Sequence, residues 1–217
     1  MAATNIVKYT VVEKNGRMTN FIVGPRLDYN VEKKLEIFKI YKISRFHAAL
    51  SVLDQLDKTD CAGLTNKLAW FPWAENKYPT EEVIFGSLMT LRHWVENLKR
   101  DEFGNIPTIY IHCAAGTHRS PTILGFYLKA FDYLTLEICP LFAQEPNKDE
   151  KLYFSNAEEY ANTYLEDDWA DNPLGEKYKQ LLKLIKENFY GSNTFLENML
   201  NNVGWDWINK KREYGSV

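Results

Sequence analysis

The chain has few cysteines, no long hydrophobic run and little net charge, and each absence removes a class of protein. Its three cysteines, Cys61, Cys113 and Cys139, are too few and too irregularly spaced for a disulfide framework, and no CxxC pair indicates zinc. No apolar stretch is long enough to span a bilayer, and residues 1–10 lack the basic and apolar segments of a secretory signal. We therefore expect a soluble cytoplasmic protein, and the cysteine spacing indicates no metal cofactor.

The charge and the apolar content narrow the class further. A formal net charge of -3 leaves no broad basic field, so neither a nucleic acid nor an anionic membrane is the expected partner. Hydrophobic residues make up 45% of the chain and aromatic residues 14%, which suffices for a large core and argues against disorder. We expect one domain over residues 1–190 with an acidic insertion near 147–172, then a helical extension over 191–217 packed on that domain. The oligomeric state stays open.

Hydrophobic periodicity predicts strands alternating with helices in the first part of the chain. Two apolar runs flank Asn15-Gly16, which predicts a β-hairpin because both residues tolerate a positive φ. A short helix is predicted over 30–41 with one core face, formed by Val31, Leu35 and Phe38. A strand is predicted over 43–52, although its two alanines leave a helix possible, and another is predicted within 67–74 and stops at Pro72.

The pattern is strongest from Pro79 onward. Glu81 and Glu82 occupy the first turn of a predicted helix whose apolar residues repeat at helical spacing: Ile84, Leu88, Leu91, Val95 and Leu98. A short apolar strand over 106–112 and a helix over 119–131 follow. A helix over 172–189 has one apolar face, formed by Tyr178, Leu181, Leu182, Ile185 and Phe189. The alternation favours an α/β fold.

The loop between the last strand and its helix has the composition of an anion site. Such a loop directs backbone N–H groups at one point, and the helix dipole adds positive potential there. The same N–H groups would stabilise the thiolate of Cys113, which is then a nucleophile at neutral pH. The guanidinium of Arg119 can hold two phosphate oxygens. The residues between these two are small enough for the backbone to approach an oxyanion: Ala114, Ala115, Gly116 and Thr117.

Residues 112–120, which read His-Cys-Ala-Ala-Gly-Thr-His-Arg-Ser, resemble the HC-x5-R-S/T signature of cysteine-dependent protein tyrosine phosphatases. The RSPT sequence that closes the loop is similar to the compact dual-specificity branch of that superfamily, and the strand, loop and helix context is the one the motif requires. Weaker similarity extends over residues 20–190. The resemblance implies a phosphatase-like α/β domain with a central, mostly parallel sheet flanked by helices, extended by C-terminal helices.

The resemblance also implies a metal-independent reaction in two steps. The Cys113 thiolate would take the phosphoryl group, and water would hydrolyse the phosphocysteine intermediate. Ser120 would donate a hydrogen bond to the sulfur, and His112 would support the loop and the thiolate through its ring. The phosphate would bind in a P-loop formed by Ala114, Ala115, Gly116, Thr117, His118 and Arg119.

The general acid is the point at which this sequence departs from the family. These enzymes resemble one another in using an Asp on a loop upstream of the cysteine, but residues 70–82 contain no Asp. Aligning the Pro before the helix places Glu75 at the acid position, and an exposed loop residue is the alternative interpretation. Glu81 and Glu82 are interpreted as charges at a helix start. Asp57 or Asp60 could serve only if the intervening loop folds unusually.

The sequence thus predicts a phosphomonoester hydrolase, with a phosphorylated protein as its substrate and mixed acceptance of phosphotyrosine, phosphoserine and phosphothreonine. The loop has no Lys, which disfavours a highly charged inositol lipid. His118 either is a variable loop residue or faces the substrate. Two alternatives stay open: a non-protein substrate, such as a nucleotide, an RNA 5′ end or a phosphorylated sugar, and a phosphate-binding module with little turnover. Cys61 and Cys139 are interpreted as packed or incidental thiols rather than redox partners of Cys113.

Overall fold

The computed structural model describes residues 6–13, 15–27, 31–43, 45–55, 65, 67–75, 77–131, 134–140 and 175–189. Several predictions from the sequence therefore lie outside the described residues: the acidic insertion near 147–172, the extension over 191–217, and the surroundings of Cys61, Asp57 and Asp60. Within the described part of the chain, no helix combines the length and the hydrophobicity needed to cross a bilayer.

Strands and helices alternate along the described chain, as the periodicity predicted. In order they are β1 (Val7–Val12), β2 (Met18–Pro25), α1 (Val31–Tyr41), β3 (Ala48–Ser51), β4 (Leu68–Trp70), α2 (Glu81–Asn97), β5 (Thr108–Cys113), α3 (Arg119–Phe131), β6 (Leu134–Pro140) and α6 (Gly175–Phe189). The seven residues of β6 form a strand that the sequence did not predict.

One sheet joins the six strands in the order β4-β3-β5-β2-β1-β6. Neighbours from β4 to β2 run parallel, whereas β1 runs antiparallel to both β2 and β6. The predicted hairpin is confirmed, since Val12 pairs with Met18 and Gly16 between them has a φ of 80°. The predicted central, mostly parallel sheet flanked by helices is also confirmed.

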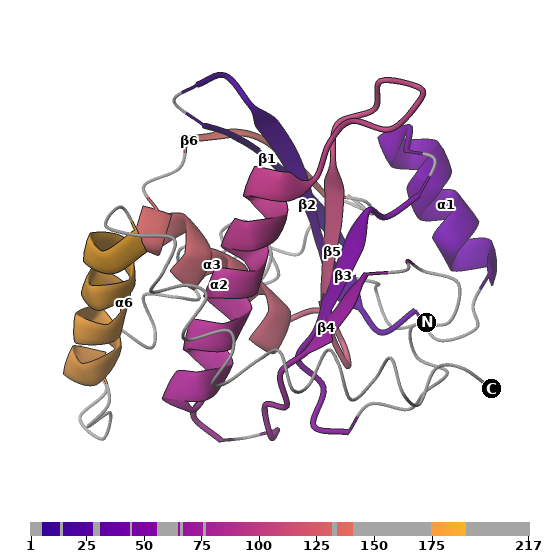
Figure 1. The fold of residues 1–217 in the computed structure, drawn as a ribbon. Helices are drawn as coiled ribbons and strands as arrows, with labels where there is room; N and C mark the ends of the chain where they lie inside the picture. The colour runs from indigo at the N-terminus through magenta and orange to yellow at the C-terminus, as the bar shows by residue number, and fades with distance from the viewer. Residues whose placement is uncertain are drawn as a thin grey trace, which may run out of the picture.

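Helices cover both faces of the sheet, with α2, α3 and α6 on one side and α1 on the other (Figure 1). Strand β5 shows why both faces are apolar: Ile109 and Ile111 pack in the α2 and α3 core, whereas Tyr110 between them packs with α1 residues. Successive side chains of a strand point to opposite faces, so a strand covered on both sides needs a continuous apolar run. The predicted apolar strand has such a run.

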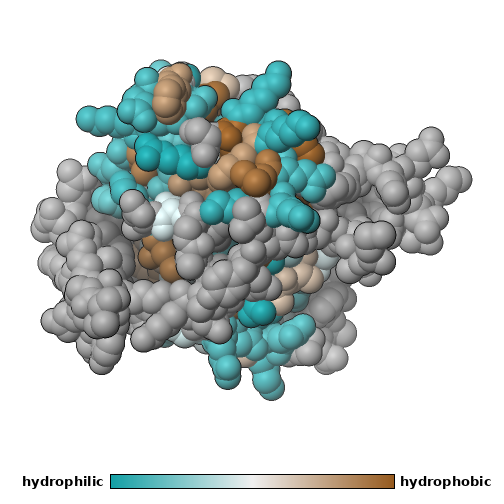
Figure 2. Space-filling view, turned by 90° about the vertical axis from the view of Figure 1, so that its right-hand side faces the viewer, coloured by the Kyte–Doolittle hydropathy of each residue, from teal (hydrophilic) through white to brown (hydrophobic). Residues whose placement is uncertain are grey.

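The predicted core face of α1 is wrong in one respect. Leu35 is 58% exposed, while Ile37 and Tyr41, one turn apart, are buried against the sheet. Apolar residues are spread around this short helix, so its spacing alone does not select the buried side. The ring of Phe38 lies 5.1 Å from that of Phe46 and is half-buried. Figure 2 views the molecule from this side, where hydrophobic residues stand among hydrophilic ones.

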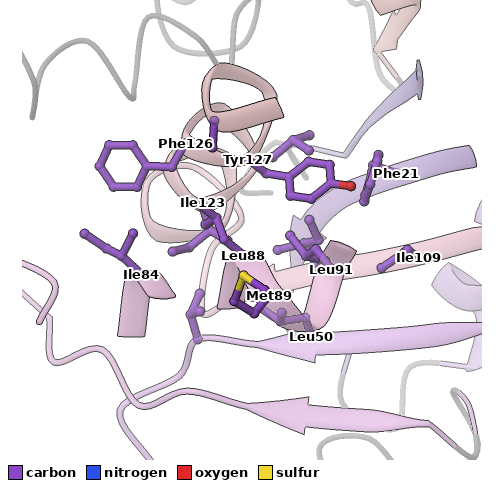
Figure 3. Packing of buried hydrophobic residues seen from close by; sticks show 14 of the residues in the cluster. Phe21, Leu50, Ile84, Leu88, Met89, Leu91, Ile109, Ile123, Phe126 and Tyr127 are labelled. Atoms are coloured by element: carbon purple, nitrogen blue, oxygen red, sulfur yellow. The ribbon is translucent and has the colours of Figure 1, made fainter. Parts of the chain in front are cut away.

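Helices α2 and α3 form the larger core, and the predicted core residues of α2 are all buried: Ile84, Leu88, Leu91, Val95 and Leu98. The helix begins at a Thr80 cap, whose side chain accepts a hydrogen bond from the Val83 N–H. In Figure 3 the side chains of α2 and α3 meet those of the strands, and the ring centroids of Phe21 and Tyr127 lie 5.4 Å apart.

Helix α6 is hydrogen-bonded to the segment that precedes α2. Its Tyr178, Leu182 and Ile185 are buried, as predicted, and Leu181 is half-buried. The Tyr178 hydroxyl donates a hydrogen bond of 2.7 Å to the carbonyl oxygen of Pro79. This contact holds the end of the loop that carries Glu75.

Candidate active site

The site lies where the parallel strands end. Pro25 at the end of β2 pairs with Cys113 at the end of β5, and Ser51 at the end of β3 pairs with His112. Parallel strands present their carboxyl ends at one edge of a sheet, and the loops that follow them meet there. The segments after β2, β3 and β5 therefore lie side by side, although the sequence separates them widely.

Cys113 ends β5 and is buried. Its Sγ accepts a hydrogen bond from the Gly116 backbone N–H at 3.3 Å, and the Ser120 Oγ lies 3.4 Å away. Helix α3 begins at Arg119, directly after the loop, so its positive end faces the same atom. An N–H group, a hydroxyl and a helix N-terminus all favour negative charge on this sulfur. This is the strand, loop and helix arrangement that the sequence predicted.

The loop is pressed against the end of β2. Gly116 has a φ of 76°, and a Cβ on it would lie 2.4 Å from the carbonyl carbon of Gly24. On the same side, the Arg26 N–H donates a 3.1 Å hydrogen bond to the carbonyl oxygen of Ala114. Only glycine fits at position 116, because the backbones meet there. Ala114, Ala115 and His118 are exposed at the mouth of the loop.

Arg119 is buried, and its guanidinium is already engaged by the protein. Nη1 donates to the carbonyl oxygen of Trp73 at 2.6 Å and forms an ion pair with Oδ1 of Asp54. These two contacts fix the orientation of the side chain that the sequence predicts to hold phosphate. Both partners belong to segments that follow other strands, β3 for Asp54 and β4 for Trp73.

Asp54 is the residue of this site that the sequence reasoning missed. Asp57 and Asp60 of the same segment were considered only as possible general acids. No acidic residue was considered as a partner of the arginine. A usable signal existed: Asp54 is the first charged residue after β3, and charged residues just beyond parallel strands gather at one edge. Its second oxygen, Oδ2, accepts the backbone N–H of Glu75 at 3.0 Å.

The loop after β4 brings Glu75 close to residues 114–118, the loop between β5 and α3. Trp73 is buried, its Nε1 donates to the carbonyl oxygen of Lys77 at 2.8 Å, and its ring lies 5.8 Å from that of His118. Glu75 is exposed, and its negative charge acts to raise the pKa of His118. Glu81 and Glu82 stand in the first turn of α2, as predicted. The carboxylate of Glu75 is thus near the loop and open to solvent.

His112 in β5 and His118 in the loop both have a lowered pKa, which favours the neutral form of each ring. Burial, then the charge of Arg26, lowers the pKa of His112 from 6.5 to about 4, although a hydrogen bond with the Cys113 backbone acts to raise it. The His112 ring stacks on Tyr110 at 5.6 Å, on the α1 side of the sheet. Burial and the charge of Arg119 lower the pKa of His118 more than Glu75 raises it.

The backbone of Cys139 on β6 lies far from that of Cys113. Cys139 pairs with Lys8 on β1, and both β1 and β2 separate β6 from β5. Three strand spacings amount to about 14 Å, while a disulfide requires Cα atoms within about 7 Å. Cys139 therefore does not form a disulfide with Cys113 in this fold. Among the residues that the structure describes, no three His, Cys, Asp or Glu side chains gather as a metal site.

Comparison with solved structures finds similarity to several phosphatases, at low sequence identity and with low TM-scores. The phosphatase domain of Yvh1 from Chaetomium thermophilum is 16% identical, with 80% of this chain and 94% of that one covered and a TM-score of 0.40. Tk-PTP in its active form is 15% identical, with 82% and 96% covered and a TM-score of 0.39. PTPMT1 in complex with PI(5)P is 13% identical, with 77% and 93% covered and a TM-score of 0.42. No family model matches the chain, and neither does any curated protein.

Proposed function

We propose that this protein hydrolyses phosphomonoesters through a phosphocysteine intermediate and that its substrates are phosphorylated proteins. The observation that carries the proposal is the surroundings of one atom. Sγ of Cys113 receives the Gly116 N–H at 3.3 Å and has the Ser120 Oγ at 3.4 Å, at the start of a helix whose first residue is the buried Arg119. These neighbours place hydrogen-bond donors and a cation around the buried sulfur, which is the environment that a cysteine nucleophile needs to attack a phosphate.

In the first step, the Cys113 thiolate attacks phosphorus and forms the P–S bond, while the bond from phosphorus to the ester oxygen breaks. Loop N–H groups and Arg119 hold the three equatorial oxygens as their charge changes. The departing oxygen takes a proton from Glu75, whose exposed loop position lies beside the phosphate loop. The products are the free hydroxyl compound and phosphocysteine.

In the second step, water attacks the phosphocysteine. A proton of that water passes to the Glu75 carboxylate, the P–S bond breaks, and inorganic phosphate leaves with Cys113 as the thiolate. Ser120 stabilises the departing sulfur because its Oγ lies within hydrogen-bond reach. Each step therefore balances without a metal or a redox partner.

The mouth of the loop supports a protein substrate. Its exposed positions, Ala114, Ala115 and His118, hold two small side chains and a histidine biased toward the neutral form. A highly charged inositol headgroup would need fixed cations there, whereas a single phosphate on a peptide needs only the loop N–H groups and Arg119. Open, small side chains also leave room for a polypeptide on either side of the phosphoresidue.

The test is steady-state hydrolysis of p-nitrophenyl phosphate in EDTA by the full chain, beside Cys113→Ser, followed by a panel of substrates. The panel contains phosphotyrosine and phosphothreonine peptides, a nucleoside monophosphate, a 5′-phosphorylated RNA and a phosphoinositide. We expect turnover that survives EDTA, disappears in Cys113→Ser and is fastest on the peptides. A matched control is Ser87→Ala, which alters a buried hydroxyl of α2 far along the chain from the loop.

Other outcomes contradict separate parts of the proposal. Turnover that persists in Cys113→Ser rejects the phosphocysteine intermediate. Higher kcat/KM on the nucleotide, the RNA or the lipid rejects the protein substrate while leaving the chemistry intact. Tight vanadate binding without turnover by the wild type identifies a phosphate-binding module instead.

A further inference from the structure

Asp54 joins the two halves of the site through its two carboxylate oxygens. Oδ1 pairs with Nη1 of Arg119, and Oδ2 accepts the backbone N–H of Glu75 at 3.0 Å. The phosphate-holding arginine and the acid-bearing loop are therefore attached to one rigid group. Trp73, two residues before Glu75, closes the triangle by accepting from the same Nη1 at 2.6 Å.

We propose that Asp54 is a positioning residue that fixes the distance between the Arg119 guanidinium and the Glu75 loop, so that phosphate binding and proton donation occur in one geometry. The inference rests on the proposed phosphatase function and adds a residue to it. Asp54 takes no part in bond making. It acts through Arg119 on the bound phosphoryl group and through the backbone of Glu75 on the leaving oxygen.

The geometry of Arg119 leaves its other nitrogens for the substrate. Both protein contacts described above use Nη1, whereas a guanidinium also has donors on Nη2 and Nε in the same plane. Holding Nη1 against the wall of the site fixes the plane of the fork, and the fork then holds two phosphate oxygens. An arginine with four freely rotating bonds would have to be ordered at each turnover.

The geometry of Asp54 separates its role from that of Glu75. Asp54 uses both oxygens on protein donors, while Glu75 contributes its backbone N–H to the contact and keeps its carboxylate for chemistry. The Arg119 side chain is 6% exposed and the Asp54 side chain 43% exposed. Asp54 thus contacts the arginine from the more exposed side of the site and, together with the Trp73 carbonyl oxygen, holds Nη1 in place.

Two effects of removing the Asp54 charge have opposite signs, which makes the proposal testable. A carboxylate near a phosphate repels it, so Asp54→Asn would strengthen oxyanion binding if charge alone mattered. If Asp54 positions Arg119, the same substitution weakens oxyanion binding, because the ion pair that holds the guanidinium is lost. We expect the second effect to dominate, since Asp54 contacts Arg119 directly and is partly screened by solvent.

The experiment compares wild type, Asp54→Asn, Glu75→Gln and the double variant, with phenyl phosphate and p-nitrophenyl phosphate as substrates. Phenyl phosphate needs a proton on its leaving oxygen, and p-nitrophenyl phosphate barely does. We expect kcat/KM of Asp54→Asn to fall about 10- to 100-fold on phenyl phosphate and less on p-nitrophenyl phosphate. The loss caused by Glu75→Gln should be smaller in the Asp54→Asn background than in the wild type, because misplacing the loop already removes much of the acid's contribution.

A binding measurement accompanies the kinetics. Calorimetry with inorganic phosphate on Cys113→Ser, with and without Asp54→Asn, should show weaker binding without the Asp54 carboxylate. Glu102→Gln, an exposed carboxylate near the opposite edge of the sheet, is the charge-matched control and should change neither measurement. Asp54→Glu retains the charge with one more methylene and serves if Asp54→Asn lowers Tm; it should lose activity while remaining folded.

The remaining outcomes bear on the positioning role of Asp54 as follows. Equal losses on both substrates, additive effects of the two substitutions and unchanged phosphate affinity would overturn the proposal, as would tighter phosphate binding by Asp54→Asn. If wild type turns over neither substrate, the phosphatase function fails. The positioning of Arg119 is then judged by the phosphate titration alone, in which equal affinities reject it and weaker binding supports it.

Discussion

The backbone of Gly116 lies against the backbone of Gly24, close enough that a Cβ on Gly116 would be 2.4 Å from the Gly24 carbonyl carbon. The contact joins the loop that follows β5 to the end of the neighbouring parallel strand, β2. It also places the Gly116 N–H 3.3 Å from the Cys113 sulfur. Packing between two backbones therefore sets the position of a hydrogen bond to the Cys113 sulfur.

Gly116→Ala should destabilise the protein and remove activity together. A left-handed φ costs a non-glycine residue roughly 1–2 kcal/mol, and the overlap with Gly24 adds to this. We expect urea unfolding to show that the free energy of unfolding falls by more than this range. We also expect kcat/KM to fall about 100-fold or more, because the loop must shift. Gly104→Ala is the matched control: Gly104 has a φ of 79° but open space around it. Equal destabilisation by the two variants would contradict the packing argument.

Ser120→Ala should slow the second step more than the first. The Ser120 Oγ is 3.4 Å from Sγ of Cys113, so its loss leaves a poorer leaving group when water attacks the phosphocysteine. One hydrogen bond of about 1 kcal/mol corresponds to a roughly fivefold fall in kcat. Rapid mixing with p-nitrophenyl phosphate should reveal a burst of nitrophenol that the wild type lacks. Ser87→Ala removes a buried hydroxyl that has no hydrogen-bond partner among the described residues and should leave kcat unchanged.

Glu75→Gln should reduce activity in proportion to the need for a leaving-group proton. We expect kcat on phenyl phosphate to fall about 100-fold or more, with little change on p-nitrophenyl phosphate. Glu82→Gln, in the first turn of α2, is the control and should cost only a few tenths of a kcal/mol of stability. Equal effects on both substrates would show that Glu75 is only a loop residue.

His112 should make folding stability depend on pH between 6.5 and 4. Its pKa is lowered to about 4 in the fold, against 6.5 ordinarily, so between these values the unfolded chain binds the extra proton. Stability is then fully present above pH 6.5 and is lost as the pH falls toward 4, by about 3 kcal/mol. Urea unfolding of wild type and His112→Gln across this range measures the difference. A parallel pH dependence in the two proteins would contradict the assignment to His112.

The strand, loop and helix arrangement around Cys113 was predictable because it is local in the sequence. Residues 112–120 are contiguous, and a strand that ends in small residues before a helix determines where its N–H groups point. The apolar run of β5 and the helical spacing of α2 were readable for the same reason, since burial on both faces or on one stripe appears directly in sequence. The face of α1 was not readable, because apolar residues surround the helix and only contact with the sheet selects Ile37 over Leu35.

The α/β alternation, the nucleophile candidate and the arginine could be predicted from the amino-acid sequence, since each depends on residues within a few positions of one another. The partners that hold the arginine could not be predicted, because they depend on how the strands pack. Asp54 and Arg119 stand 65 residues apart, and they meet only because β3 and β5 are parallel neighbours whose ends share one edge of the sheet. The same edge brings Gly24 to Gly116 and Glu75 to Asp54. Hydrophobic periodicity indicates which face of a helix or strand is buried, but it does not indicate which strands become neighbours. The order of the strands in the sheet brings the residues of this site together.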